Sequence, residues 1–172
     1  MMQVIRCDHD EEKERMIDFI LAHRKEINPA YDVRTVFFSL GTQLLYGDTL
    51  LVLNNENELI GFVGYLFGTP ENQFQDPETV RIEMVYLKNN YRCTRHFIAC
   101  FRKLLTHIEE ANLDTIKIQF YVNKENDYLC KLSSKFAIVE STTLSNFGEE
   151  LLYSTSLTEV KTYLENIAGV TV

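Results

Sequence analysis

Apolar residues recur along this chain with two different periods, and the switches between them predict the order of helices and strands. Apolar positions spaced three and four apart are typical of amphipathic helices, and they occur over residues 8–26, 33–46, 92–111, 126–134 and from 156 onward. Alternating or short continuous apolar runs predict strands over residues 3–7, 50–53, 59–67, 79–87, 115–122, 136–144 and 150–155. The order is therefore β-α-α-β-β-β-α-β-α-β-β-α. It predicts an α/β fold with a mixed central sheet of about seven strands and helices on both faces.

Residues with special roles at helix ends support these boundaries. Asp8 followed by Glu11 resembles a helix start, and Ser156 followed by Glu159 forms the pattern of a capping box. Gly47 with Asp48 is expected to close the second helix. No stretch reads as a linker, so residues 1–172 are expected to form a single domain of ordinary size.

Composition narrows the class of protein. The hydrophobic fraction of 45% excludes a disordered chain. No apolar run approaches the ~20 residues of a membrane span, and the first ten residues become charged too soon for a signal peptide. These features predict a cytoplasmic protein with no membrane partner.

The net charge of −8 argues against a nucleic-acid partner, because an acidic chain lacks the attraction to phosphate backbones that drives such binding. It suits a cationic or amine-bearing partner better. The alternative is that the charge serves solubility alone.

Cysteines and histidines do not form a metal site in the predicted structure. Cys93, His96, Cys100 and His107 fall within one arc of a helix, but a straight helix spreads them over roughly 20 Å. Because the four cysteines form no Cys-x-x-Cys pair, reduced and mostly buried thiols are expected instead.

Three segments of the chain resemble the GNAT family of N-acetyltransferases. Residues 50–67 (LLVLNNENELIGFVGYLF) look like the second and third strands of that family, joined by a hairpin. Residues 81–97 (RIEMVYLKNNYRCTRHF) look like its central strand and cofactor-binding turn, and residues 120–136 (FYVNKENDYLCKLSSKF) like its next strand and helix. The resemblance covers roughly residues 48–155 and implies acetyl-CoA as co-substrate.

The cofactor-binding turn departs from the family pattern. That pattern is Tyr-Arg-Gly-x-Gly-x-Gly/Ala at the start of a helix, and only Tyr91 and Arg92 match it. The three glycine positions hold Cys93, Arg95 and Phe97. Glycine lets backbone N–H groups at a helix N-terminus approach a pyrophosphate closely. Two interpretations stay open: the side chains block that approach, or the main chain is open and nearby side chains add donors.

The resemblance implies a set of cofactor-binding residues. The pantetheine arm would pair with the backbone at the end of the fourth strand, at Val85, Tyr86 and Leu87. The pyrophosphate would lie at the start of the following helix, at Arg92, Cys93, Thr94, Arg95, His96 and Phe97.

Glu83 is the candidate general base, because many members of the family carry a glutamate at this position of the fourth strand. A carboxylate there can remove a proton from the acceptor ammonium through a water molecule. Neighbouring Val85 and Leu87 would raise its pKa by desolvation. Alternatively, Glu83 is a solvated carboxylate paired with Arg81 or Lys117.

The general acid is less well defined. Many members of the family carry a tyrosine in the helix after the fifth strand, and the aligned position here is Lys131 or Cys130. Tyr128, one turn earlier, is the possible substitute, with an ordinary half-buried tyrosine as the alternative.

These features together lead to one functional hypothesis and one rival. The hypothesis is an acetyl-CoA-dependent N-acetyltransferase acting on a small-molecule or peptide amine, with no metal. The rival is a catalytically inactive GNAT-fold binding or regulatory module. The resemblance also implies that the second helix lines the acceptor side, where Tyr31, Phe37 and Phe38 would lie if they are not core residues. A homodimer is compatible with either hypothesis.

Overall fold

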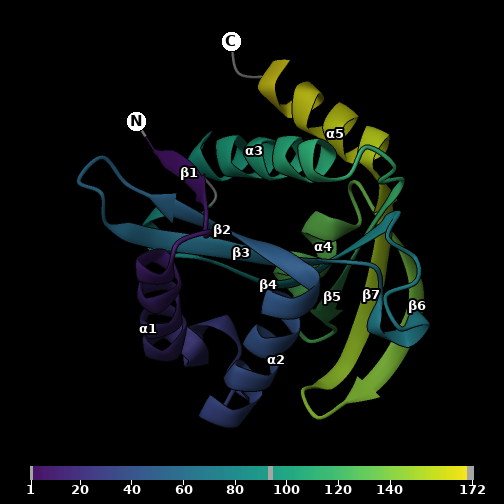
Figure 1. The fold of residues 1–172 in the computed structure, drawn as a ribbon. Coiled ribbons are helices and arrows are strands. Elements are labelled where there is room, and N and C mark those ends of the chain that lie inside the picture. The colour runs from purple at the N-terminus through teal and green to yellow at the C-terminus, as the bar shows by residue number, and fades with distance from the viewer. Residues whose placement is uncertain (1, 93–94, 170–172) are drawn as a thin grey trace. The chain divides into compact units, whose positions relative to one another are not determined.

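The computed structural model describes residues 2–92 and 95–169, and the order of its elements is the predicted one (Figure 1). The helices are α1 (Asp10–Ile27), α2 (Val33–Tyr46), α3 (Arg95–Ala111), α4 (Asp127–Ser133) and α5 (Leu157–Gly169). The strands are β1 (Gln3–Arg6), β2 (Gly47–Leu53), β3 (Leu59–Phe67), β4 (Thr79–Leu87), β5 (Lys117–Asn123), β6 (Ile138–Ser145) and β7 (Gly148–Ser156). Among the described residues, these strands form one sheet in the order β1-β2-β3-β4-β5-β7-β6.

The sheet is mixed, as expected. β4 and β5 pair in parallel, with Thr79 opposite Lys117 and Ile82 opposite Phe120. The pairs β1–β2, β2–β3, β5–β7 and β6–β7 are antiparallel. The parallel pairing of β4 and β5, which are joined through α3, agrees with the predicted mixed sheet of strand–helix–strand units and hairpins.

The chain forms two compact units. The first contains the residues up to Leu66 together with Glu83–Leu104, and the second contains Phe67–Ile82 and the residues from Leu105 onward. Residues of β4 and α3 are divided between the units. The single domain expected from the sequence stays a prediction.

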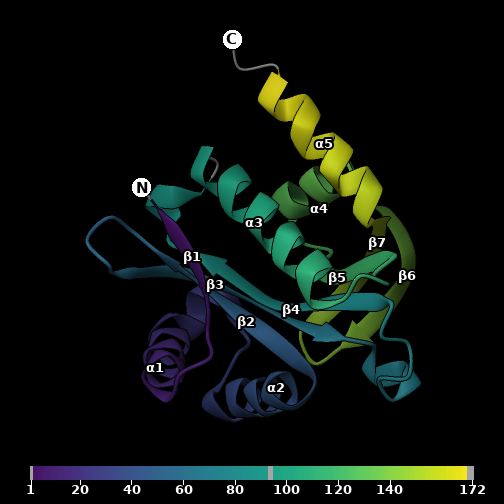
Figure 2. The same ribbon diagram turned by 45° about the horizontal axis from the view of Figure 1, so that its top comes forward.

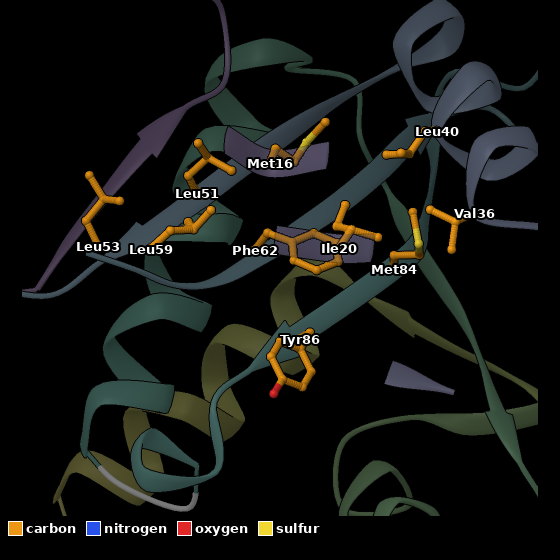
Figure 3. Packing of buried hydrophobic residues seen from close by; sticks show 10 residues of the cluster. All are labelled: Met16, Ile20, Val36, Leu40, Leu51, Leu53, Leu59, Phe62, Met84 and Tyr86. Atoms are coloured by element: carbon orange, nitrogen blue, oxygen red, sulfur yellow. The ribbon is translucent and has the colours of Figure 1, made fainter. Parts of the chain in front are cut away.

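The core of the first unit lies between helices α1 and α2 and strands β2, β3 and β4 (Figure 3). Met16 and Ile20 of α1 and Val36 and Leu40 of α2 are almost fully buried there. The strands contribute further buried side chains: Leu51, Leu53, Leu59, Phe62, Met84 and Tyr86. Both helices thus bury one apolar stripe, as their spacing predicts.

The opposite face of the first unit is covered by the beginning of α3 (Figure 2). Phe97 and Cys100 of α3 pack against Val52, Ile60 and Leu87. At Gly61 a side chain does not fit, because its Cβ would lie 2.6 Å from the Tyr86 carbonyl oxygen. Strands β3 and β4 therefore approach closely beside the end of β4.

The second unit buries apolar residues of β5, β7 and α5. Ile118, Val122, Leu152, Val160 and Leu164 are at most 9% exposed. Aromatic rings extend this core: Phe120 stacks on Tyr153 at 5.6 Å, and Phe136 lies 5.1 Å from Tyr163. The capping box that opens α5 is confirmed, since Ser156 N–H donates to Glu159 and Glu159 N–H donates to the Ser156 hydroxyl.

Two local expectations need correction, and one is confirmed. Helix α1 begins after His9, whose N–H donates to Glu12, one residue later than the Asp8–Glu11 pattern predicts. Helix α2 ends where expected, because Gly47 is its C-cap and its N–H donates to the Gln43 carbonyl oxygen; from there the chain enters β2 in an extended conformation. Cys7, Cys100 and Cys130 are free thiols, and they are half-buried instead of buried.

Candidate active site

The turn after β4 leads into the N-terminus of a long helix, the geometry that anion sites use. β4 ends at Leu87, a 3-10 turn covers Asn89–Tyr91, and α3 begins at Arg95. The first backbone N–H groups of a helix have no intrahelical acceptor and carry a partial positive charge. No acidic residue lies in the first turn of α3 to neutralise that charge. Residues Arg95, His96 and Phe97 therefore supply backbone donors suited to an anion.

Arg92 is held between β4 and this helix. Its Nε donates to the Leu87 carbonyl oxygen at 2.5 Å, and its guanidinium carbon lies 5.0 Å from the centre of the Tyr86 ring. The residue is exposed to solvent. A fixed cation thus stands three residues before the start of α3, where it would add to the attraction for an anion.

Tyr86 is a buried structural residue and its side chain does not point into open space. It is 4% exposed, and its hydroxyl donates to Glu26 Oε2 of α1 at 2.5 Å. Its ring lies within 5.8 Å of those of Phe19 and His23. Burial and the hydrogen bond to Glu26 raise the pKa of Tyr86 to about 12. Any contact of Tyr86 with a cofactor would have to use its backbone.

Val85 and Leu87 differ from each other. The Val85 side chain is 60% exposed between two buried neighbours, whereas Leu87 is 8% exposed and packs against β2 and β3. Phe97 also packs into this cluster, with its ring 5.9 Å from that of Phe101. The side chain at the third glycine position of the family pattern is thus drawn toward the core.

Glu83 lies on β4 with intermediate exposure, four residues before Leu87. The sequence suggests two cations, Arg81 and Lys117, as ion-pair partners of Glu83. In the structure each of them forms an ion pair with another carboxylate. Arg81 forms an ion pair with Glu71, and Lys117 forms one with Glu140 at 2.9 Å. The role of Glu83 as a base stays a prediction.

A polar network in the second unit was missed by the sequence analysis. Arg81 is 3% exposed, and its two terminal nitrogens donate to both carboxylate oxygens of Glu71 at 3.2 and 3.3 Å. It also donates to Gln119 Oε1 at 3.0 Å, and the Gln119 amide donates to Glu140 at 2.5 Å. Its guanidinium lies 5.0 Å from the centre of the Tyr121 ring.

This network changes the ionisation of its carboxylates. Partial burial raises the pKa of Glu71, but a backbone hydrogen bond and the Arg81 charge outweigh burial and hold this pKa below its usual value. Burial also raises the pKa of Glu140, but the hydrogen bond and charge of Lys117 outweigh burial, so this pKa is lowered. The signal for the network was an arginine between Val80 and Ile82 in an otherwise apolar part of a strand.

Tyr128 stands on the first turn of α4 in the second unit and is 58% exposed. Cys130, one of the two positions aligned with the general acid of the family, places its thiol 3.7 Å from the Asn123 carbonyl oxygen. Lys131, the other, is exposed. Tyr128 remains the candidate acid, as a prediction.

The structure thus brings together the residues of the cofactor turn, and it places Tyr128 in the other unit. Glu83, Val85, Tyr86, Leu87, Arg92 and Phe97 all belong to the first unit. Cys93 and Thr94 lie outside the described residues, as do the side chains of Arg95 and His96. A separate hollow of about 730 Å³ in the second unit, lined by Phe136, Ile138 and Tyr163 among others, contains none of the candidate residues.

Two further observations concern metals and membranes. Within residues 2–92 and 95–169, no group of three or more histidine, cysteine or acidic side chains is placed to hold a metal ion. None of the helices in these ranges has the length and apolar character needed to cross a membrane.

Comparison with known proteins identifies the fold through structure and not through sequence. No family model and no curated protein sequence matches the chain. Solved structures do match. A GNAT-family acetyltransferase from Staphylococcus aureus Mu50 superposes with a TM-score of 0.67 at 18% identity, covering 91% of this chain and 99% of the other.

Two further acetyltransferases match over nearly their whole lengths. A spermidine N-acetyltransferase from Vibrio cholerae, solved with CoA and spermine, gives a TM-score of 0.65 at 8% identity and covers 92% of this chain and 96% of its own. A ribosomal-protein-S5-alanine acetyltransferase from Vibrio fischeri gives 0.64 at 14% identity, covering 90% and 92%. At these identities the likeness establishes that the chain has the GNAT fold.

Proposed function

We propose that this protein is an acetyl-CoA-dependent N-acetyltransferase that acts on a primary amine. The observation that carries the proposal is the GNAT fold combined with a helix N-terminus in the turn after β4 whose first turn contains no acidic residue. Solved proteins with this fold include acetyltransferases of polyamines and of a ribosomal protein. A fold hosts several functions, so the chemistry of the site has to support the proposal as well.

The cofactor turn fits the anionic end of CoA. The backbone donors of Arg95, His96 and Phe97 and the fixed charge of Arg92 would bind the pyrophosphate. Because Phe97 packs against Val52, Ile60 and Leu87, a phenylalanine in place of glycine is compatible with a bound pyrophosphate at that position. The pantetheine arm would pair with the β4 backbone at Val85, where the side chain is exposed.

The reaction is a direct transfer. The amine nitrogen attacks the thioester carbonyl carbon, the new C–N bond forms, and the C–S bond breaks to release the CoA thiolate. Glu83 takes the proton from the ammonium through a water molecule, and Tyr128 supplies a proton to the thiolate. The acidic net charge would favour a cationic acceptor. Small-molecule amines and peptide amines are therefore the acceptors to test.

The rival function is a GNAT-fold module that binds without catalysis. The observation that favours it is the loss of all three glycines in the cofactor turn, at Cys93, Arg95 and Phe97. A side chain that projects toward the pyrophosphate would weaken CoA binding and leave the fold intact.

Two measurements on the same preparation separate these functions. Calorimetric titration with acetyl-CoA reports binding, and release of the CoA thiol in the presence of a panel of amines reports transfer. The proposal predicts binding together with amine-dependent thiol release. Binding without release from any amine supports the rival module, and the absence of both removes CoA from the account.

A matched pair of variants tests the pyrophosphate site. Arg95→Asp places an acid in the first turn of α3, where it opposes the helix charge, and Lys103→Asp makes the same charge change two turns later. We expect Arg95→Asp to weaken acetyl-CoA binding by roughly three- to ten-fold, about 1 kcal/mol. Lys103→Asp should change it by less than about two-fold. Equal effects of the two variants would place the pyrophosphate elsewhere.

A further inference from the structure

Helix α2 presents an apolar face to solvent in addition to the one it buries. Val36, Leu40 and Gln43 face the core of the first unit and are at most 2% exposed. On the other side, four large apolar residues are mostly open to solvent: Phe37 at 53%, Phe38 at 78%, Leu44 at 53% and Leu45 at 77%. Exposed apolar surfaces of this kind mark interaction sites in soluble proteins.

The exposed residues are arranged symmetrically about Gly41. Phe37 and Phe38 lie four and three positions before it, and Leu44 and Leu45 lie three and four positions after it. Positions three and four apart share one face of a helix. A Cβ built on Gly41 would meet nothing within 4 Å. The face therefore has an open notch at its centre and two bulky side chains on each side of it.

The charge of this face distinguishes it from the rest of the chain. Helix α2 contains a single charged residue, Arg34, and no aspartate or glutamate. The whole chain carries 25 acidic and 17 basic residues, so two copies have the same sign of net charge and repel each other. That repulsion is weakest where both copies present α2.

The area is sufficient for a small interface. With ~200 Å² for a whole aromatic side chain and slightly less for leucine, the four residues expose roughly 500 Å² per copy. Two copies would bury about 1,000 Å², which is the lower limit for a specific protein–protein interface. A small amine could cover only one end of this face, because Phe37 to Leu45 spans about 12 Å along the helix axis.

We propose that this face, defined by Phe37, Phe38, Gly41, Leu44 and Leu45, pairs with the same face of a second copy of the chain. The two α2 helices cross antiparallel on a two-fold axis at Gly41, because a two-fold interface brings each residue of the face against its symmetric counterpart. Phe37 then contacts Leu45 of the second copy, and Phe38 contacts Leu44. The missing side chain at Gly41 lets the two helix axes approach closely.

The test measures mass in solution by sedimentation from about 1 µM to about 100 µM, a range that brackets the affinity of small interfaces. The wild-type chain should dimerise within this range. Phe38→Lys and Leu45→Lys should each weaken the dimer at least ten-fold, whereas Leu113→Lys, at a 91% exposed leucine of the second unit, should not. A monomeric wild type, or a dimer that survives both α2 substitutions, overturns the proposal.

A mixing experiment tests the antiparallel crossing. Phe37→Asp and Leu45→Lys should each be monomeric alone, and their mixture should form a heterodimer, because the opposite charges then face each other across the axis. A mixture that stays monomeric overturns the crossing at Gly41. If Phe38→Lys instead raises the KM for an amine acceptor and leaves the mass unchanged, the face belongs to the acceptor site and the proposal is wrong. Circular dichroism of each variant checks that the exposed substitutions leave the fold intact.

Discussion

The two units of this molecule bury their strands in different ways. In the first unit, Leu50–Leu53 of β2 and Leu59–Leu66 of β3 are buried at every position, between α1 and α2 on one face and α3 on the other. In the second unit, Ile138–Leu144 of β6 is exposed at every position. Strands covered on both faces must be apolar throughout, whereas an exposed edge strand is free to carry serine and threonine.

The difference extends to how each unit handles charge. Among the described residues, the core cluster of the first unit contains no charged residue; the Tyr86 hydroxyl donates to Glu26, and the buried Gln43 amide donates to the Thr49 hydroxyl. The second unit buries a guanidinium, at Arg81, and pairs it with Glu71 and Gln119. The comparison teaches that the first unit depends mainly on packing with neutral buried polar groups, whereas the second unit also depends on a buried charge and its partners.

The largest effect is expected on turnover, from a substitution at Glu83. This is the residue of β4 at which the chain passes from the second unit into the first. If the chain is an enzyme, Glu83→Gln should lower turnover by about 10²- to 10⁴-fold and leave acetyl-CoA affinity nearly unchanged. The loss should shrink as the pH rises toward ~10, because the acceptor amine is then already neutral. Steady-state rates against pH, with chemistry shown to limit turnover, provide the measurement.

The control for this prediction is Lys117→Met, which removes the partner of Glu140 and should affect stability more than rate. Turnover that is insensitive to Glu83→Gln at neutral pH would remove Glu83 from the mechanism. Positioning of an amine that loses its proton to solvent would then have to carry the catalysis.

The second effect compares the packing of the two units. Phe62 is 1% exposed in the first core, so Phe62→Ala should lower the free energy of unfolding by about 3–5 kcal/mol. Leu144 is 83% exposed on β6, and Leu144→Ala should change it by less than about 0.5 kcal/mol. Denaturant titration measures both. Similar losses at the two positions would mean that β6 is covered in solution.

The third effect tests the polar network. Glu71→Gln removes the charge that faces the buried guanidinium of Arg81, which should cost about 1–2 kcal/mol, less than a fully buried pair because Glu71 is itself half exposed. The matched control is Glu149→Gln, whose partner Lys124 is also about half exposed, with an expected loss below about 1 kcal/mol. An equal loss in both variants would show that burial of Arg81 adds nothing.

The smallest effect is a pH dependence from the loop before β4. Burial raises the pKa of Asp76, but hydrogen bonds from Thr69 and Asn72 outweigh burial and hold this pKa below the ordinary 3.8. A lowered carboxyl pKa contributes stability that is complete above about pH 4 and is lost as the pH falls through the folded pKa. Asp76→Asn should therefore lower stability by about 0.5–1 kcal/mol at neutral pH and show less acid sensitivity below pH ~4. Unfolding curves at several pH values measure this, and parallel pH profiles of the two proteins would contradict it.

The sequence predicted the order of all the elements because each element has a clear apolar period. α2, β3 and β4 were predicted with the bounds the structure has. Helix ends were predicted less well: the Asp8–Glu11 pattern suggested a start at Asp8, but His9 is the N-cap and its carbonyl oxygen accepts the hydrogen bond from Lys13 N–H. The pairing of Arg81 with Glu71 could not be predicted, because it depends on a loop whose path no periodicity records.

The location of the candidate site stays a prediction, and the structure adds details that the sequence did not contain. The resemblance placed the cofactor turn at the end of β4, and the structure has the start of α3 there, with no acidic residue in its first turn. That Phe97 packs toward the core and that Arg92 lies over Tyr86 follow from tertiary contacts with β2 and β3, which a local motif does not contain. Phe37 and Phe38 were weighed as core or acceptor contacts, and their exposure excludes the core.

The account rests on transfer of an acetyl group to an amine, and isotope-labelled acetyl-CoA tests this directly. The protein is incubated with the labelled thioester and an amine, and mass spectrometry follows the label while a thiol reagent counts free CoA. The account predicts that labelled amide and CoA thiol appear one for one, and that both disappear when the amine is left out. Thiol release without labelled amide, or acetyl-CoA binding with no turnover of any amine, would contradict it.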